Sequence, residues 1–250
     1  MRHLLIDADS FAYTIGSRVM VPVDLDDGNV YSVFNKADIK ADLSVIMEDM
    51  FRELGTRKAT FFLSDPKPVA CWRKLIYPGY KNKRVPGHRP MAYQAVRDEM
   101  SSRFPVIQEP NMEADDLVGI WSTESSGEER VVVSPDKDLL TIPGLVYNPT
   151  KKTLDFVTLD QADMNLMAQT LTGDITDNYP GLPGCGPKTA AKILAEASTL
   201  LEAWPLVVKA FEKHGLTAAD ARVQAQMAGI LRHGQYNWTT GLVTPWQPPK

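Results

Sequence analysis

The hydrophobic positions of the first 160 residues alternate between two repeat patterns. Continuous apolar runs at 3–6, 59–63 and 130–133 are typical of strands that are buried on both faces. From Asn35 to Gly55, apolar residues recur every three or four positions, which predicts an amphipathic helix capped by Asn35 and stopped by Gly55. Strands that alternate with helices in this way predict an α/β fold with a mostly parallel central sheet flanked by helices.

Weaker patterns complete this half of the chain. The Asp-Gly pair at 27–28 separates two short apolar stretches and predicts a hairpin. Further helices are expected at 91–104 and 113–122, the latter capped by Asn111, and the remaining apolar stretches predict a short strand near Val106 and a hairpin over 145–157.

After about Asp160 the pattern is typical of helices alone. The expected helices span 161–171, 187–197, 203–213 and 217–233. We therefore predict two parts and a tail: an α/β core over 1–160, a helical region over 161–235, and an irregular segment over 236–250.

Composition adds few constraints. The chain has 250 residues, is 44% hydrophobic and has only two cysteines, Cys71 and Cys185, which form no zinc-binding spacing and suit a reducing compartment. No apolar run approaches transmembrane length. We expect a cytoplasmic protein that does not bind membranes.

Acidic residues gather where the predicted strands and helices begin or end. There are nine of them: Asp7, Asp65, Glu113, Asp115, Asp116, Asp136, Asp138, Asp174 and Asp177. The carboxyl ends of parallel strands converge on one crevice, where unneutralised carboxylates repel each other and raise each other's pKa. All-oxygen donors favour hard cations, so the pattern predicts a site for Mg²⁺ or Mn²⁺.

Each acidic motif also has a simple structural explanation. Glu113 to Asp116 is consistent with an ordinary acidic first turn of a helix, and Asp136 to Asp138 with a capped turn. We expect Asp9 to cap a helix that begins before Phe11, although a tenth ligand position is the alternative.

The formal net charge of −4 conceals a strong asymmetry. Setting the nine acids aside from the 31 Asp and Glu residues leaves 22, against 27 Lys and Arg. The stretch from Trp72 to Arg103 has eight basic residues, and aromatic residues alternate with the charges around Tyr80 and Lys81. This pattern favours a channel in which bases stack while phosphates are neutralised, although a short basic run is often simply exposed surface.

The Gly- and Pro-rich segment from Gly173 to Ala190 is the most specific motif. Its glycines allow a tight turn, Pro187 is suited to the first position of a helix, and Lys188 adds a positive charge. The segment predicts a helix–hairpin–helix element over 178–198 that binds the backbone of duplex DNA without reading its sequence.

Six motifs in order resemble the structure-specific 5′ nucleases, which include flap endonucleases, the 5′-nuclease domain of bacterial DNA polymerase I and bacteriophage 5′–3′ exonucleases. The motifs are Ile6-Asp7, Phe62 to Asp65, Tyr80-Lys81 with Arg84, Glu113 to Asp116, Ser134 to Asp138, and Gly173 to Ala190. The resemblance runs from about residue 3 to residue 200. Ala8 departs from the glycine that this family often has after the first aspartate.

The resemblance implies a PIN-like nuclease core, a helical arch over about 72–104 and hydrolysis with two metal ions. One ion would be served by Asp7, Asp65, Glu113 and Asp115, and the other by Asp115, Asp136, Asp138 and Asp177, with Asp116 and Asp174 in support. Lys81 and Arg84 would hold the scissile phosphate. The DNA contacts would come from Tyr80, Lys83, Gly184, Gly186, Lys188 and Thr189, and K⁺ could bind at the hairpin.

By the same resemblance, the substrate would be DNA with a 5′ end, flap or junction, cleaved to 5′-phosphate products, and RNA–DNA hybrids could also be cleaved. We expect a monomer. Two alternatives remain. A PIN-like ribonuclease would share the sheet and acidic pocket but needs neither the glycine-rich hairpin nor a basic arch. A non-catalytic DNA-end-binding protein would lack metal ligands.

Overall fold

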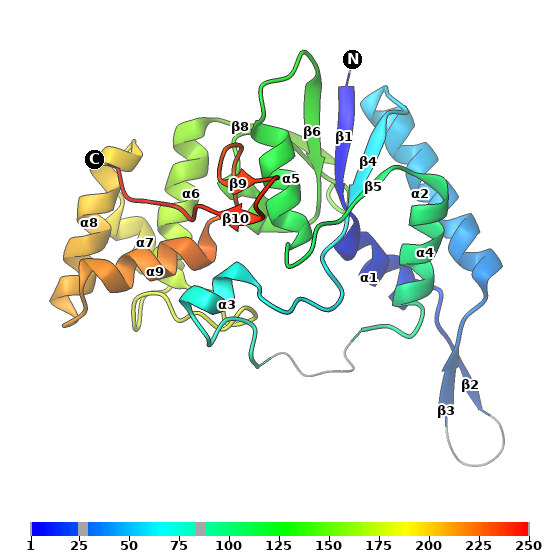
Figure 1. Ribbon diagram of the computed structural model, residues 1–250, viewed down its shortest axis with the longest axis horizontal. Helices are drawn as coiled ribbons and strands as arrows, with labels where there is room; N and C mark the ends of the chain where they lie inside the picture. Colours follow the sequence, from blue (N-terminus) through cyan, green and yellow to red (C-terminus); the bar gives the residue numbers. More distant parts are fainter. Residues whose placement is uncertain (1, 25–29, 84–88, 250) are drawn as a thin grey trace.

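A six-stranded sheet forms the centre of the molecule (Figure 1). The computed structural model describes residues 2–24, 30–83 and 89–249. The strand order is β5-β4-β1-β6-β7-β8. The strands are β1 (Arg2–Asp7), β4 (Ala59–Phe62), β5 (Val106–Ile107), β6 (Glu129–Val133), β7 (Gly144–Asn148) and β8 (Thr153–Val157). The first five run parallel and only β8 is antiparallel to its neighbour, so the mostly parallel sheet is confirmed.

Helices cover both faces of this sheet, because alternate residues of each strand point to opposite sides. Leu4 and Ile6 belong to the cluster packed under α1 (Ala8–Arg18), α2 (Lys36–Leu54) and α4 (Tyr93–Arg103). Leu5 lies in the opposite cluster, with α5 (Ala114–Thr123) and the start of α6 (Leu159–Thr172). Figure 1 shows α1, α2 and α4 on one side of the sheet and α5 on the other.

The C-terminal part is helical, as expected. With α6 it comprises α7 (Pro187–Ile193), α8 (Leu200–Lys213) and α9 (Ala218–Ala228), packed around a third cluster. The helix predicted over 217–233 ends five residues early at Ala228. Gly229 adopts an extended conformation there, and the carbonyl groups of Met227 and Gly229 accept hydrogen bonds from Arg73. A tertiary contact therefore ends this helix.

The tail is more ordered than predicted. Strands β9 (Tyr236–Asn237) and β10 (Leu242–Val243) pair into a small antiparallel sheet. Further along, the Trp246 ring packs on the Trp204 ring at a centroid distance of 5.0 Å. Tyr236 and Trp246 of the tail are thus held by packing on the core and the helices, whereas Trp238 and Leu242 are exposed.

Two of the predicted helix caps are wrong. Asp7, not Asp9, caps α1, and its carboxylate accepts a hydrogen bond from the Ser10 N–H. Glu113, not Asn111, precedes α5. Asn111 has a positive φ of 61°, and its side-chain oxygen accepts hydrogen bonds from the backbone N–H groups of 69 and 70. Both Asp7 and Asn111 therefore accept hydrogen bonds from backbone N–H groups, but these partners differ from the predicted ones.

The segment predicted as a helical arch differs from that prediction in the residues described. It contains α3 (Trp72–Ile76), a turn to Lys83, and α4, whose Val96 and Met100 are fully buried on the sheet side. α4 therefore belongs to the core layer, because its apolar face packs on α1 and α2.

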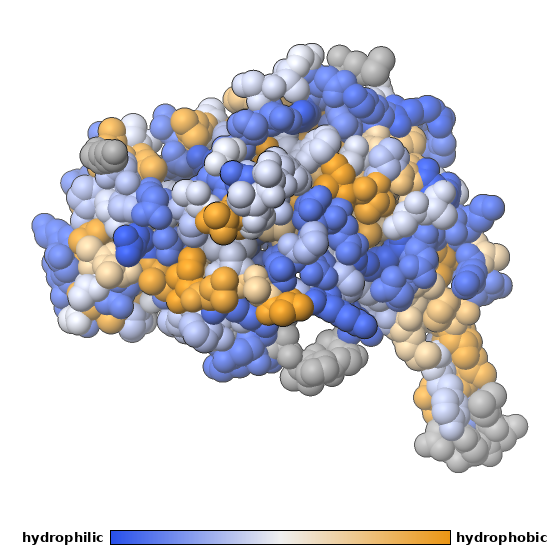
Figure 2. Space-filling view, in the orientation of Figure 1, coloured by the Kyte–Doolittle hydropathy of each residue, from blue (hydrophilic) through white to orange (hydrophobic). Residues whose placement is uncertain are grey.

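A hairpin of β2 (Val21–Asp24) and β3 (Val30–Val33) projects from the core, and its predicted Asp-Gly turn lies outside the described residues. Val21, Val30 and Val33 of the hairpin are exposed, and Figure 2 shows hydrophobic surface along this projection at the lower right. Among the described helices, none has both the length and the apolar character that crossing a membrane requires.

Candidate active site

Asp7 lies at the carboxyl end of the central strand. Its Cα pairs with Phe62 of β4, and the preceding residue pairs with Val133 of β6, so the carboxylate lies at the middle of the predicted crevice. The side chain is buried, and its Oδ2 accepts a hydrogen bond of 2.9 Å from the Ser134 hydroxyl. Burial and the nearby Asp9 carboxylate raise the pKa of Asp7 to about 6.

Two more carboxylates near this edge have raised pKa values. Burial, and then the Asp7 carboxylate, raise the pKa of Asp115 in the first turn of α5, and Asp136 adds to the effect. Asp138 lies in a 3₁₀ helix, η1 (Lys137–Thr141), which Asp136 caps. Burial and the Asp136 carboxylate raise the pKa of Asp138 to about 6. These acids from three segments therefore share one electrostatic environment.

The pKa of Glu113 is lowered rather than raised, because cations surround this carboxylate. Its Oε2 accepts hydrogen bonds from Arg73 at 2.6 Å and from the Tyr80 hydroxyl at 3.1 Å, and its Oε1 pairs with Lys81. Burial alone would raise the pKa of Glu113, but the Lys81 and Arg73 cations outweigh it and lower that pKa to about 2. Tyr80 and Lys81 also contact Asp177, at 3.0 and 3.3 Å, so Asp177 joins the same network.

Asp116 has hydrogen-bond donors of the protein itself on both oxygens, which suits the supporting role predicted for it better than direct binding of an ion. The side chain is fully buried. Arg73 binds both of its oxygens, at 2.7 and 2.8 Å, and the Trp72 indole and the Leu231 N–H each donate one more hydrogen bond. Four donors saturate the carboxylate, so Asp116 is part of the framework behind the site.

Asp65, Asp136 and Asp174 hold loops in place. The Asp65 oxygens accept hydrogen bonds from the backbone N–H groups of 67 and 111. One oxygen of Asp174 accepts from the N–H groups of 176 and 177, and one oxygen of Asp136 accepts from the N–H of 138. These bonds stiffen the turns that present the acids.

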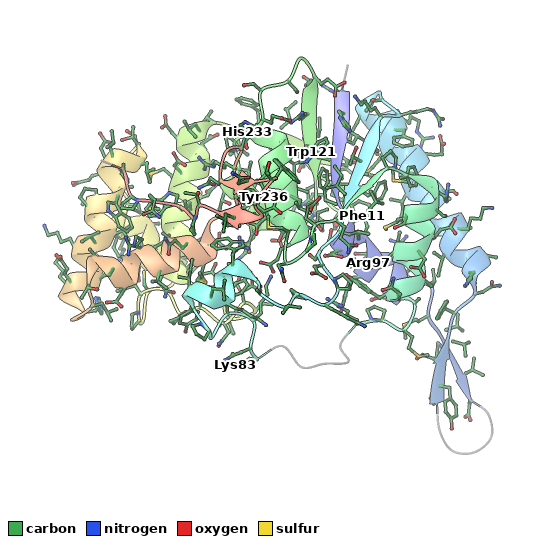
Figure 3. The ribbon with its side chains drawn as sticks, viewed as in Figure 1. Phe11, Lys83, Arg97, Trp121, His233 and Tyr236 are labelled. Atoms are coloured by element: carbon green, nitrogen blue, oxygen red, sulfur yellow. The ribbon has the colours of Figure 1, made fainter. Side chains whose placement is uncertain are left out.

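The basic run differs from its prediction in two ways. Tyr80 is buried, so its ring has no exposed face on which a base could stack. Arg73 and Arg97 are buried too, and each is paired with carboxylates rather than being part of a surface patch. Lys83 is exposed on the segment after α3, whereas Figure 3 shows Arg97 between α1 and α4. Arg84 lies outside the described residues.

The glycine-rich loop has a compact base and an open tip. A side chain at Gly173 would collide with the backbone of 179–181, so the loop closes tightly after α6. Gly184 has a positive φ of 73°, and neither it nor Gly186 has another group near the position of a Cβ. Lys188 and Thr189 are exposed at the start of α7. The DNA-binding role of this loop remains a prediction.

The donor set fits a hard divalent cation. Carboxylates dominate it, and Asp138 Oδ1 is buried with no hydrogen-bond partner among the residues described. Within the same residues, no three Asp, Glu, His or Cys side chains are already arranged as a cage for an ion. Binding would therefore draw the carboxylates together as their mutual repulsion is neutralised.

Sequence reasoning missed two residues of the site. Arg73 was counted with the exposed basic run, and nothing in that run distinguishes it. Ser134 directly follows a buried strand, which was a usable signal, because residues at such ends face the crevice. Its hydroxyl orients Asp7.

Comparisons with known proteins identify the family of this chain. A family model described as the 5′-3′ exonuclease, N-terminal resolvase-like domain, matches residues 2–165. The exonuclease of Escherichia phage T7 is 27% identical over 98% of this chain and 93% of the phage protein. Flap endonuclease Xni of Shewanella oneidensis is 29% identical over 63% of this chain and 65% of its own length.

Solved structures show the same fold. The 5′-exonuclease of bacteriophage T5, solved with zinc ions, superposes with a TM-score of 0.67 at 13% identity, over 91% of this chain and 89% of that one. A flap endonuclease of bacteriophage T5, solved with DNA and metal ions, also has a TM-score of 0.67 at 14% identity, with the same coverage. At this identity the likeness concerns the fold.

Proposed function

Because the chain belongs to the 5′-3′ exonuclease family, we propose that it hydrolyses DNA phosphodiester bonds near 5′ ends, flaps or single-strand/duplex junctions with two divalent metal ions. One observation supports this most directly. Burial and neighbouring carboxylates raise the pKa values of acids at the sheet edge, as Asp7 and Asp138 show. Such a pocket is unfavourable by itself and favourable around dications.

Asp7, Asp115, Asp136 and Asp138 would hold the ions most directly. We place Asp65, Glu113, Asp174 and Asp177 at the margin, where they could bind through water. Oxygen donors favour Mg²⁺ or Mn²⁺. When bound, such a pair of ions activates a water molecule and stabilises the leaving oxygen.

Lys81 is suited to hold the scissile phosphate, because it already lies between Glu113 and Asp177 at the pocket. The Tyr80 hydroxyl supports it by bridging the same two acids, rather than by stacking on a base. A cation at this position would offset the negative charge that develops on the phosphate. For Arg84, only the family resemblance supports the same role.

The glycine-rich loop would bind the duplex. Its open backbone at Gly184 and Gly186, beside exposed Lys188 and Thr189, suits contacts with phosphates and could also hold K⁺. Lys83 would add a contact near the pocket. We propose 5′-phosphate products and extend the activity to the RNA strand of RNA–DNA hybrids.

The test compares three 5′-labelled substrates in Mg²⁺: a DNA flap, a plain DNA duplex and an RNA duplex. We expect cleavage of the flap, and Asp115→Asn should slow it by roughly 10²–10³-fold or more. Asp160→Asn is the matched control, because Asp160 is exposed at the start of α6. Binding of the flap in Ca²⁺ should be similar for all three proteins.

Preferential cleavage of the RNA duplex would favour the ribonuclease alternative. No cleavage of any substrate, together with DNA binding, would favour the end-binding protein. Unimpaired cleavage by Asp115→Asn would remove the metal assignment.

A further inference from the structure

Arg73 is the most highly connected side chain of the described site. Two of its hydrogen bonds join it to Asp116 as a fork, and one joins it to Glu113. The others, from Nε at 3.3 Å and from Nη2 at 2.8 Å, reach the carbonyl oxygens of Met227 and Gly229. All three of its nitrogens are therefore engaged, although the side chain is only 3% exposed.

Two of these acceptors come from the far end of the chain. We call residues 227–233 the C-terminal strap. Besides its contacts with Arg73, the strap donates the Leu231 N–H to Asp116 at 3.1 Å and the His233 N–H to the Thr123 hydroxyl at 2.7 Å. A side chain at Gly119 would collide with the Leu231 carbonyl, so the strap lies directly on α5. Figure 3 shows His233 and Tyr236 beside that helix.

The contacts form a continuous path from the strap to an acid of the pocket. Asp116 is bound by both Arg73 and Leu231, and Arg73 in turn binds Glu113 in the turn just before α5. The Arg73 guanidinium also lies over the Trp72 ring, 4.3 Å from its centre, which prevents it from swinging aside. Tyr80 and Lys81 also hold Glu113, and the third group that binds it, Arg73, is itself fixed by groups more than a hundred residues away in sequence.

We infer that the C-terminal strap is a working part of the active site, and that Arg73 is the positioning residue through which it holds Glu113 for metal binding. This inference rests on the proposed function. The matched family domain ends at residue 165, so the strap lies outside it. This role requires the planar guanidinium group of arginine, whose N–H groups point in fixed directions. A lysine ammonium in the same place could not bind two acids and two carbonyl groups at once.

The experiment measures Mn²⁺ affinity of the full-length protein without DNA, by titration calorimetry well below the melting temperature. Arg73→Lys keeps the positive charge and removes the fork. We expect it to weaken Mn²⁺ binding roughly tenfold, as Glu113→Gln should, with the loss of cleavage partly rescued by excess Mn²⁺. A purely structural defect would not show that rescue.

Arg232→Lys is the matched control. Arg232 belongs to the strap and binds Asp163 and the Thr141 carbonyl at the end of η1, but it binds no acid of the site, so Arg232→Lys should change Mn²⁺ affinity much less than Arg73→Lys. Thr123→Val is a milder variant that removes the acceptor for the His233 N–H, together with the hydrogen bond that the hydroxyl donates to the Gly119 carbonyl within α5. It should weaken Mn²⁺ binding slightly, and it provides the answer if Arg73→Lys does not fold.

The outcomes separate the two proposals. If Glu113→Gln weakens Mn²⁺ binding while Arg73→Lys and Thr123→Val bind like the wild type, the strap inference is overturned and the proposed function stands. If the wild type binds no Mn²⁺, the proposed function itself fails. If Arg232→Lys is as weak as Arg73→Lys, the strap acts through general stability and the positioning role is refuted.

Discussion

Asp115 and Asp116 are neighbours in sequence, yet they lie in two different environments, Asp115 in the acidic site and Asp116 in the framework behind it. Asp116 faces the framework, where Arg73, Trp72 and a backbone N–H satisfy both oxygens. Asp115 faces the sheet edge, where burial and Asp7 raise its pKa. Within the described residues, Asp116 is thus paired with an arginine of the protein itself, whereas at Asp115 burial and neighbouring carboxylates outweigh the nearby Lys81. On our proposal, acids such as Asp116 stabilise the fold and acids such as Asp115 hold the metal ions.

The largest change in stability should come from Asp116→Asn. The change leaves Arg73 buried without its carboxylate fork, and breaking one partner of a buried pair costs about 3–5 kcal/mol. In a chain of this length the melting temperature should fall by on the order of 10 °C. Asp115→Asn, measured alongside in metal-free buffer, should show no such loss. Equal destabilisation by both variants would erase the distinction between the two environments.

Added Mg²⁺ should stabilise the protein in a pH-dependent way. The pKa values of Asp7 and Asp138 are raised to about 6 in the folded protein, so the folded state binds more protons than the unfolded chain between about pH 4 and pH 6. Metal-free stability therefore falls as pH rises through this window, and Mg²⁺ must compete with protons at its lower end. At 100 times its Kd, Mg²⁺ contributes about 2.7 kcal/mol.

We expect a rise in melting temperature of roughly 5–10 °C with Mg²⁺ at pH 7.5, and a much smaller rise at pH 5. Differential scanning calorimetry at both pH values, with Na⁺ at matched ionic strength as the control, measures it. A rise of the same size at both pH values would show that these carboxyls do not bind the ion.

Lys81→Met tests the border between the two environments. Lys81 neutralises Glu113 and contacts Asp177, so its ammonium occupies acids that the ions would otherwise use. Without it, Mn²⁺ should bind roughly fivefold more tightly, about 1 kcal/mol, while DNA cleavage falls because the phosphate loses its cation. Calorimetry and the flap assay measure the two effects separately. Lys67→Met, in the loop after Asp65, is the exposed control. Weaker Mn²⁺ binding in Lys81→Met would contradict the competition.

The smallest expected change in stability comes from the repulsion between carboxylates of the site. Asp115→Asn should raise the melting temperature of the metal-free protein by roughly 2–4 °C, because it removes one of several like charges from a partly buried pocket. The same variant should gain less from Mg²⁺ than the wild type. A lower melting temperature in metal-free buffer would mean that Asp115 has a stabilising partner.

Local patterns predicted most of the fold. Apolar runs marked β1, β4 and β6, the caps Asn35 and Gly55 bounded α2, and the turn to helices after about residue 160 was found. These succeeded because period and capping depend on residues that are close in sequence. The end of α9 and the order of the tail were missed, since both depend on contacts with distant segments.

For the nine acids, too, the sequence predicted some features and the contacts between distant segments decided others. Their positions at element ends, and hence an acidic pocket that suits hard cations, could be read from the sequence, because strand polarity alone brings such ends to one edge. Only the tertiary structure decided which of them receive an internal partner. Arg73 reads as one more surface cation in the basic run, yet packing buries it between α5 and the C-terminal strap, where it takes Asp116 and Glu113. A charged side chain can be buried only where complementary groups surround it, because its removal from water is otherwise too costly. Which groups these are depends on how distant segments of the chain pack together.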